Sequence, residues 1–131
     1  MIENGYDEAS FQGLTAGNPL PNRTPTLLHS GIVYPDERDP SALFEALGRL
    51  KAAGAIRPGD FRIRFRAAVH ETLLEQLAAK HSVGEFIEIC PSVSYREALT
   101  EMLRADALVI MQGANCNEQI PAKMYEYLRA R

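Results

Sequence analysis

The sequence predicts an α/β fold: a Rossmann-like half-domain whose parallel sheet has the spatial order 3-2-1-4 and carries helices on both faces. From residue 27 onward, short apolar runs alternate with amphipathic stretches, which is typical of right-handed βαβ units. The last apolar run, ALVIM at 107–111, lacks polar alternation, as expected for a strand that is covered on both faces. A chain of 131 residues suits one domain that needs no disulfide or metal to be stable.

The first 26 residues are predicted to be a linker or lead-in. They contain three glycines and three prolines and show little periodicity. The hydrophobic core is therefore expected to begin at Leu27, and the folded domain is expected to span residues 27–131.

Eight elements are expected after the lead-in. Asp39 and Pro40 provide an N-cap and a first-turn proline for the first helix, and Ser94 with Glu97 forms a capping box before the third. Leucines on the first two helices repeat at helical spacing, so we expect them to face the core and not a ligand. Strands are expected at 27–33, 61–66, 86–90 and 106–111, and helices at 40–53, 70–81, 95–104 and 121–130.

The second strand alternates apolar residues with arginine, in the order FRIRFR from Phe61 to Arg66. Such alternation predicts a strand with one incompletely covered face. The arginines are expected to be bare on that face, and a phosphate contact from Arg66 is the lesser alternative. The three histidines, at 29, 70 and 81, have no partner motif and are interpreted as structural.

Composition excludes several functional classes. A formal charge of −3, from 14 Lys and Arg against 17 Asp and Glu, gives no basic footprint for nucleic acid. Cys90 and Cys116 lack metal-ligand spacing and are expected to be free thiols in a reducing cytoplasm. No metal or cofactor is predicted. The sequence has neither a signal peptide nor a run of roughly 18 apolar residues, so a cytoplasmic location is expected.

The last expected helix carries the clearest sign of function. Pro121 suits a first helical position, which leaves Glu118 in the preceding loop and Glu126 on the second turn. Unpaired N–H groups at a helix N-terminus attract anions, and a nearby carboxylate can accept hydrogen bonds from vicinal hydroxyls. That combination suits a nucleotide-sugar diphosphate.

Three segments support a family resemblance. Glu118 and Glu126 have the E-x7-E spacing, and residues 120–130 read IPAKMYEYLRA. NGYD at 4–7 and RADALV at 104–109 agree in order and distance. These segments resemble the C-terminal, donor-binding domain of group 1 retaining glycosyltransferases of the GT-B fold, and the resemblance covers nearly the whole chain.

The resemblance implies how a nucleotide-sugar donor is held. Glu126 would bind the ribose diol, Glu118 would contact sugar hydroxyls, and Lys123 would neutralise phosphate or extend along the surface towards solvent. The nucleobase would pack on the loop after the third strand, formed by Cys90, Pro91, Ser92 and Val93. No metal is implied, and no catalytic residue is identified.

The carboxyl ends of the first and fourth strands should bracket the donor, because ligands bind where the topology of an α/β sheet reverses. Gly31 permits close approach to the backbone, and Arg38 either meets the diphosphate or is a solvated neighbour of Asp36 and Asp39. Many members of the family carry a second basic residue directly after the glycine. Ile32 takes that place here, which weakens the expected phosphate clamp.

Two interpretations of the whole chain remain open. In the first, residues 27–131 are a partial nucleotide-sugar-binding domain that lacks an N-terminal domain for a saccharide or lipid-linked acceptor, as well as the closing strands. Such a fragment would be inactive alone, would pair into a homodimer through its fourth strand, and would belong to a full-length protein that is cytoplasmic or peripheral to the inner membrane. In the second, it is a non-catalytic Rossmann-like binding or interaction module. A receiver domain is disfavoured, because the first strand ends in His29-Ser30-Gly31 without an acidic pair.

Overall fold

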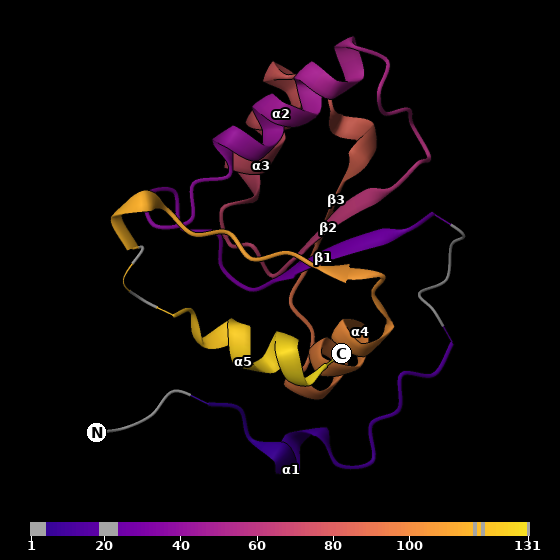
Figure 1. Cartoon of the computed structure of the whole chain (residues 1–131), viewed down its shortest axis with the longest axis vertical. Helices are drawn as coiled ribbons and strands as arrows, with labels where there is room; N and C mark the ends of the chain where they lie inside the picture. Colours follow the sequence, from indigo (N-terminus) through magenta and orange to yellow (C-terminus); the bar gives the residue numbers. More distant parts are fainter. Residues whose placement is uncertain (1–4, 19–23, 117, 119, 131) are drawn as a thin grey trace.

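A computed structural model describes residues 5–18, 24–116, 118 and 120–130 of the protein. Within these residues a four-stranded, all-parallel sheet has the order β3-β2-β1-β4 (Figure 1), which confirms the predicted fold class and strand order. The strands are β1 (Thr26–Ser30), β2 (Arg62–Arg66), β3 (Ile87–Cys90) and β4 (Ala107–Leu108).

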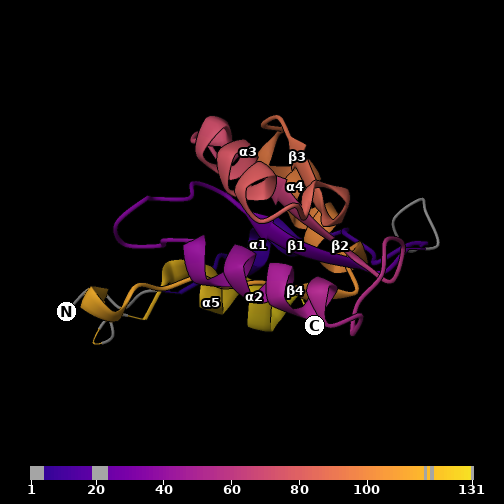
Figure 2. The same cartoon turned by 90° about the horizontal axis from the view of Figure 1, so that it is seen from above.

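Helices cover both faces of the sheet, as predicted. In Figure 1, α2 (Ser41–Ala52) and α3 (Glu71–Lys80) lie on the upper face, and α4 (Tyr95–Arg104) and α5 (Ala122–Arg129) lie on the lower face. Figure 2 shows α2 and α3 next to each other from above. Short 3-10 turns, η1 (Gly84–Phe86) and η2 (Ala114–Cys116), precede β3 and follow β4. No helix in the described part of the chain has the length and apolar character that a bilayer span requires.

Each face of the sheet has its own core. Above it, Phe44 of α2 stacks on Phe65 of β2 with ring centroids 6.1 Å apart, and both side chains are fully buried. Below it, a smaller cluster joins Leu28 of β1 to Leu99 of α4 and Tyr127 of α5. Side chains on successive strand residues point to opposite faces, so one strand serves both clusters.

Most elements begin and end within one residue of the predicted bounds, but β1 and β4 are shorter than expected. β1 ends at Ser30 and not at residue 33, because Gly31 adopts a positive φ of 115° that interrupts the extended conformation. Gly31 N–H and Val33 N–H still donate to Arg66 C=O and Ala68 C=O beside β2. β4 was expected at 106–111 and covers only 107–108. Beyond it, Val109 N–H still donates to Leu28 C=O at 2.8 Å.

Two side chains end the pairing of β1 with β4. In a continued parallel ladder, Ser30 N–H would donate to Val109 C=O. Instead, Ser30 N–H donates to the Tyr127 hydroxyl oxygen at 2.9 Å, and Val109 C=O lies 3.0 Å from Nδ1 of His29. A carbonyl can only accept, so the proton of the neutral His29 ring lies on Nδ1. The two strands therefore separate at their carboxyl ends.

The lead-in contributes to the core, which corrects the expectation that the core begins at residue 27. Glu8–Phe11 forms the short helix α1, and Phe11 is buried in the lower cluster. Arg129 of α5 binds Glu8 through two hydrogen bonds of 2.6 and 2.7 Å and lies over the Phe11 ring. A four-residue helix is too short to show a periodic pattern, so hydrophobic periodicity does not predict it.

The arginines of β2 are paired with carboxylates, which corrects the expectation that they are bare on an incompletely covered face. Arg64 bonds Glu88 and Glu101 at 2.7 Å each, and Arg66 bonds Glu101 and the Pro91 carbonyl at 2.8 Å each. The sequence pattern could not predict this pairing, because it depends on the position of α4, which brings Glu101 over Arg64 and Arg66. Burial opposes ionisation of Glu101, yet hydrogen bonds from Arg66 and Arg64 hold its pKa below the usual value.

Candidate functional site

The candidate site lies where β1 and β4 separate. The helices change from one face of the sheet to the other between these two strands, which makes this the topological switch point. In open α/β sheets, ligands bind outside the carboxyl ends of the strands at such a point. Two segments follow these ends, residues 31–39 after β1 and residues 109–121 after β4.

Gly31 and Lys123 are in close contact across this opening. A Cβ atom placed on Gly31 would lie 1.9 Å from Nζ of Lys123, a separation no real pair of atoms can adopt. Lys123 belongs to the first turn of α5, so its side chain extends from the helix start to the end of β1. Glycine is favoured at position 31 by the positive φ, and a larger residue there would also displace the Lys123 ammonium group.

Arg38 provides a second cation near Lys123. Its Nη1 donates to Ile32 C=O at 3.2 Å, and its guanidinium lies 5.1 Å from the centre of the Tyr34 ring. Asp39, one of the two acids considered as its neighbours, instead accepts the Ser41 N–H at 2.9 Å before α2. Arg38 is therefore held by a carbonyl and an aromatic ring.

The two cations have no carboxylate partner within ion-pair distance among the described residues. Burial lowers the pKa of Lys123, and the positive charge of Arg38 lowers it further, against a smaller opposing effect of Glu126. Two positive charges held close together without a counterion repel each other. An anion bound between them would relieve that repulsion.

Glu126 already has a partner within the protein. Its Oε1 accepts a hydrogen bond of 2.7 Å from the hydroxyl of Tyr95, the first residue of α4. This bond, together with burial, raises the pKa of Tyr95 to about 12. The carboxylate is half-buried and joins α5 to α4, so a ligand hydroxyl would have to use its other oxygen or displace Tyr95.

The remaining residues of the E-x7-E segment contribute little to a closed site. Glu118 is exposed and makes no hydrogen bond or ion pair with the residues that the structure describes. A cavity of about 40 Å³ lies between Arg38, Met111 and Pro121. Sites for small ligands usually enclose roughly 300–1,000 Å³, so this opening holds part of a ligand at most as it stands.

The predicted nucleobase loop follows β3, so it lies at the carboxyl ends of the strands like the candidate site, but β2 separates it from β1. Cys90 C=O accepts from Ala67 N–H at 3.0 Å, Pro91 C=O accepts from Arg66, and Val93 is exposed. Burial raises the pKa of the Cys90 thiol, so the thiol is protonated at neutral pH. A hollow of about 240 Å³ lies between Val93 and the paired side chains of Arg66 and Glu101.

Sequence reasoning missed the residues that shape the opening. His29 was interpreted as structural and Tyr127 was not singled out, yet these two side chains keep β1 and β4 apart. A usable signal was present, since Lys123 and Tyr127 are four residues apart and so share one face of α5. Burial lowers the pKa of His29, and its Nε2 is buried without a hydrogen-bond partner in the described structure.

The fold and the site define a Rossmann-like α/β protein with a cationic opening at its switch point. Comparison with known proteins adds no family to this class: neither a protein-family model nor a curated protein nor a solved structure matches the chain. Within the described residues, no group of three or more His, Cys, Asp or Glu side chains is arranged to hold a metal ion.

Proposed function

We propose that this chain binds the nucleotide-sugar donor of a retaining glycosyltransferase, which transfers a hexose to a saccharide or lipid-linked acceptor. One observation carries the proposal: Lys123 and Arg38 lie beside Gly31 at the switch point without a carboxylate partner among the described residues. The family resemblance of residues 118–130 supports the same assignment.

The diphosphate of the donor is the group that suits the two cations. Its negative charge matches Lys123 and Arg38, and the start of α5 adds N–H groups without intrahelical partners. Lys123 reaches the position that Ile32 leaves without a basic side chain, so it supplies from α5 the second charge of the clamp. During transfer, the same charges would stabilise the leaving diphosphate.

Glu126 is the proposed ligand of the ribose hydroxyls, through the carboxylate oxygen that Tyr95 does not occupy. Glu118, which is exposed in the segment before α5, is the proposed contact to the sugar hydroxyls. Transfer further requires an acceptor held opposite the donor. We assign that role to a separate domain, so these residues alone are expected to bind the donor without turnover.

Calorimetric titration with nucleoside diphosphates tests the assignment. Binding of UDP, GDP or ADP is expected, and Lys123→Met should weaken it about 10- to 150-fold, since a hydrogen bond to a charged group contributes roughly 1.5–3 kcal/mol. The matched control is Lys80→Met, on the exposed end of α3, which should leave the affinity unchanged. Equal affinities for the Lys123 variant and the wild type would refute the phosphate clamp.

A second pair of variants tests Glu126. Glu126→Ala should reduce nucleoside diphosphate affinity by about 1–3 kcal/mol, while Tyr95→Phe, which removes only the hydrogen bond to that carboxylate, should maintain or improve it. Unfolding of the Glu126 variant, or equal loss in both variants, would indicate that the carboxylate only joins α4 to α5.

The competing proposal is a non-catalytic Rossmann-like binding or interaction module. The Tyr95–Glu126 hydrogen bond favours it, because the carboxylate is already used inside the protein. The small cavity beside Arg38 favours it as well. This alternative predicts that none of the nucleoside diphosphates binds, even when added at millimolar concentration.

A further inference from the structure

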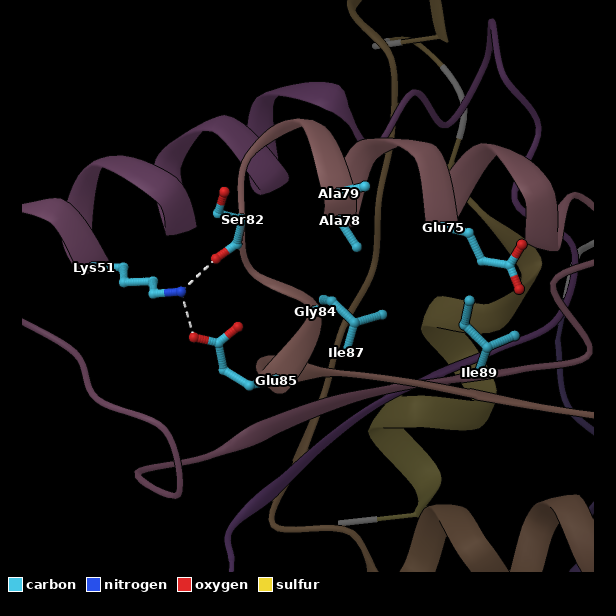
Figure 3. Close-up of a pocket in the computed structure, with 9 residues that line it drawn as sticks. All are labelled: Lys51, Glu75, Ala78, Ala79, Ser82, Gly84, Glu85, Ile87 and Ile89. Carbon is cyan, nitrogen blue, oxygen red and sulfur yellow. Dashed lines mark hydrogen bonds and ion pairs between the residues drawn. The ribbon is translucent and has the colours of Figure 1, made fainter.

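A groove on the opposite edge of the sheet has no role in the proposed donor site. It lies between α3 and the edge strand β3 and encloses about 530 Å³. Figure 3 shows its lining: Lys51, Glu75, Ala78, Ala79, Ser82, Gly84, Glu85, Ile87 and Ile89. Within the described residues, β3 pairs with β2 alone, and the candidate donor site is at β1 and β4.

The floor of the groove is apolar. Ile87 and Ile89 of β3 extend into it from below, and Ala78 and Ala79 of α3 limit it from above (Figure 3). Both isoleucines are only half-buried, although they pack against the upper core. Half-buried aliphatic side chains beside a hollow of this size indicate an apolar surface with room for further side chains.

The edge of β3 also presents unpaired backbone groups. Cys90 C=O accepts from Ala67 N–H, so the backbone N–H and C=O of Cys90 face β2. Backbone groups of successive residues in a parallel strand point to opposite sides, so those of Ile87 and Ile89 point away from β2. Ile87 N–H is occupied by Gly84 C=O within η1. The N–H and C=O of Ile89 and the C=O of Ile87 therefore face outward, the geometry at which an extended segment adds to a sheet.

The two ends of the groove differ in charge. At one end, Lys51 Nζ binds both Ser82 C=O and a carboxylate oxygen of Glu85, so those charges are matched. At the other end, the Glu75 carboxylate lies beside Ile89 in Figure 3 and has no hydrogen bond or ion pair with the described residues. The groove therefore carries one unmatched negative charge, which calls for a positive charge on its occupant.

We propose that this groove binds an extended peptide segment of a partner protein, which adds to β3 as a fifth strand. Alternate apolar side chains of the segment enter between Ile87, Ile89 and the alanines of α3, and a lysine or arginine pairs with Glu75. A peptide fits better than a small molecule, because most residues on the rim are exposed and the groove is open along its length. The backbone edge would provide affinity, and the groove and Glu75 would provide specificity.

Selection from a displayed library of random heptapeptides tests this proposal, with the wild-type chain as bait and Ile89→Thr as counter-bait. Threonine keeps the β propensity of the strand and removes part of the apolar floor. We expect enriched peptides to alternate apolar and polar residues and to carry a basic residue. No enrichment for the wild type over the Ile89 variant would overturn the proposal.

The enriched peptide is then titrated by NMR into the full chain. At saturation, hydrogen exchange of the Ile89 amide should slow about tenfold or more, because a new backbone bond protects it. Glu75→Gln should weaken binding about two- to fivefold, as for an exposed ion pair, and Glu71→Gln, on the same helix but outside the groove, should not. Binding that leaves Ile89 exchange unchanged would overturn strand addition. Ile89 protection that rises with protein concentration alone would show that a second copy of this chain is the occupant instead.

Discussion

The two faces of the sheet are built on different physical principles. The upper face is closed by a continuous apolar layer that includes Phe44, Phe65 and Phe86, all fully buried. The lower face has a smaller apolar cluster, and beside it a carboxylate, Glu101, that binds two arginines of β2. Stability is therefore concentrated above the sheet, and charged groups that can be rearranged or bind ligands are concentrated below it.

The difference between the faces shows why the candidate site lies where it does. Apolar packing is favourable with little directional requirement, so α2 and α3 can pack over the centre of the sheet, with the groove left at the β3 edge. Charged and hydrogen-bonding groups must each find a partner. The Tyr127 hydroxyl on the lower face accepts from Ser30 N–H of β1, and the His29 ring, which packs against Phe65 on the upper face, bonds Val109 C=O just after β4. The opening between these strands follows from that choice of partners.

The largest effect is expected from a cavity in the upper face. Phe44→Ala should lower the free energy of unfolding by about 3–5 kcal/mol, the range for removing a buried phenylalanine. Denaturant unfolding followed by circular dichroism measures it. Tyr34→Ala removes an exposed ring as the control and should change the stability by less than about 0.5 kcal/mol, apart from the loss of its contact with Arg38.

A smaller but still large effect is expected from the charged network of the lower face. Glu101→Gln leaves Arg64 and Arg66 without their shared carboxylate and should cost about 2–3 kcal/mol, somewhat below the range for a fully buried pair. Glu88→Gln, at a more exposed carboxylate, is the matched control and should cost less. Equal losses in chemical denaturation would show that burial of Glu101 does not matter.

Tyr127→Phe tests the hydrogen bond that keeps β1 and β4 apart. Without the hydroxyl, the buried N–H of Ser30 loses its partner, at an expected cost of about 1–2 kcal/mol. If Val109 C=O then becomes the partner, β4 would lengthen, and amide exchange at Ser30 would stay slow. Unchanged stability together with unchanged backbone chemical shifts at 109–111 would contradict the role assigned to Tyr127.

The smallest effect at neutral pH concerns His29, whose pKa is lowered from 6.5 chiefly by burial, with Lys123 and Arg38 adding repulsion. The unfolded chain binds the proton more readily, so stability is complete above pH 6.5 and falls as the pH drops below it. Below pH 4.5, protonation of Glu101 adds a further loss. His29→Gln should flatten the decline between about pH 6.5 and 5, whereas His70→Gln, at an exposed histidine, should not. Parallel declines in both variants would contradict this assignment.

The same contrast explains what the sequence could predict. Leu43, Phe44 and Leu47 repeat at helical spacing, and the capping box of Ser94 and Glu97 is present as expected, so the helices and the strand order followed from local pattern. Partners across the lower face are distant in sequence: Glu101 meets Arg64 across 37 residues, and Ser30 meets Tyr127 across 97. No local pattern encodes such contacts.

The candidate site, like the fold, was predictable in its location but not in its long-range contacts. Gly31, Arg38, Lys123 and Glu126 were chosen by motif and position. The structure places Lys123 beside Gly31 and bonds Arg38 to Ile32, after the carboxyl end of β1, and their role in donor binding stays a prediction. The hydrogen bond from Tyr95 to Glu126 was not predictable, because it depends on how α4 and α5 pack against each other. The predicted end of β4 was wrong for a similar reason, since Tyr127 of α5 takes the Ser30 N–H that a longer β4 would bond, whereas β1 ended early at Gly31.

The contact between Glu8 and Arg129 joins residues that are 121 positions apart. Closing so large a loop restricts nearly the whole chain. Each doubling of loop length adds only about 0.6 kcal/mol to the entropic cost of closure, so we expect the long loop to affect the folding rate more than the stability. Contacts of such long range generally form late in folding. During synthesis, α1 would leave the ribosome early, and Phe11 would stay accessible until its partners in β1, α4 and α5 have formed. The lower face would accordingly be completed last, and a chaperone that recognises aromatic side chains would find Phe11 during that interval.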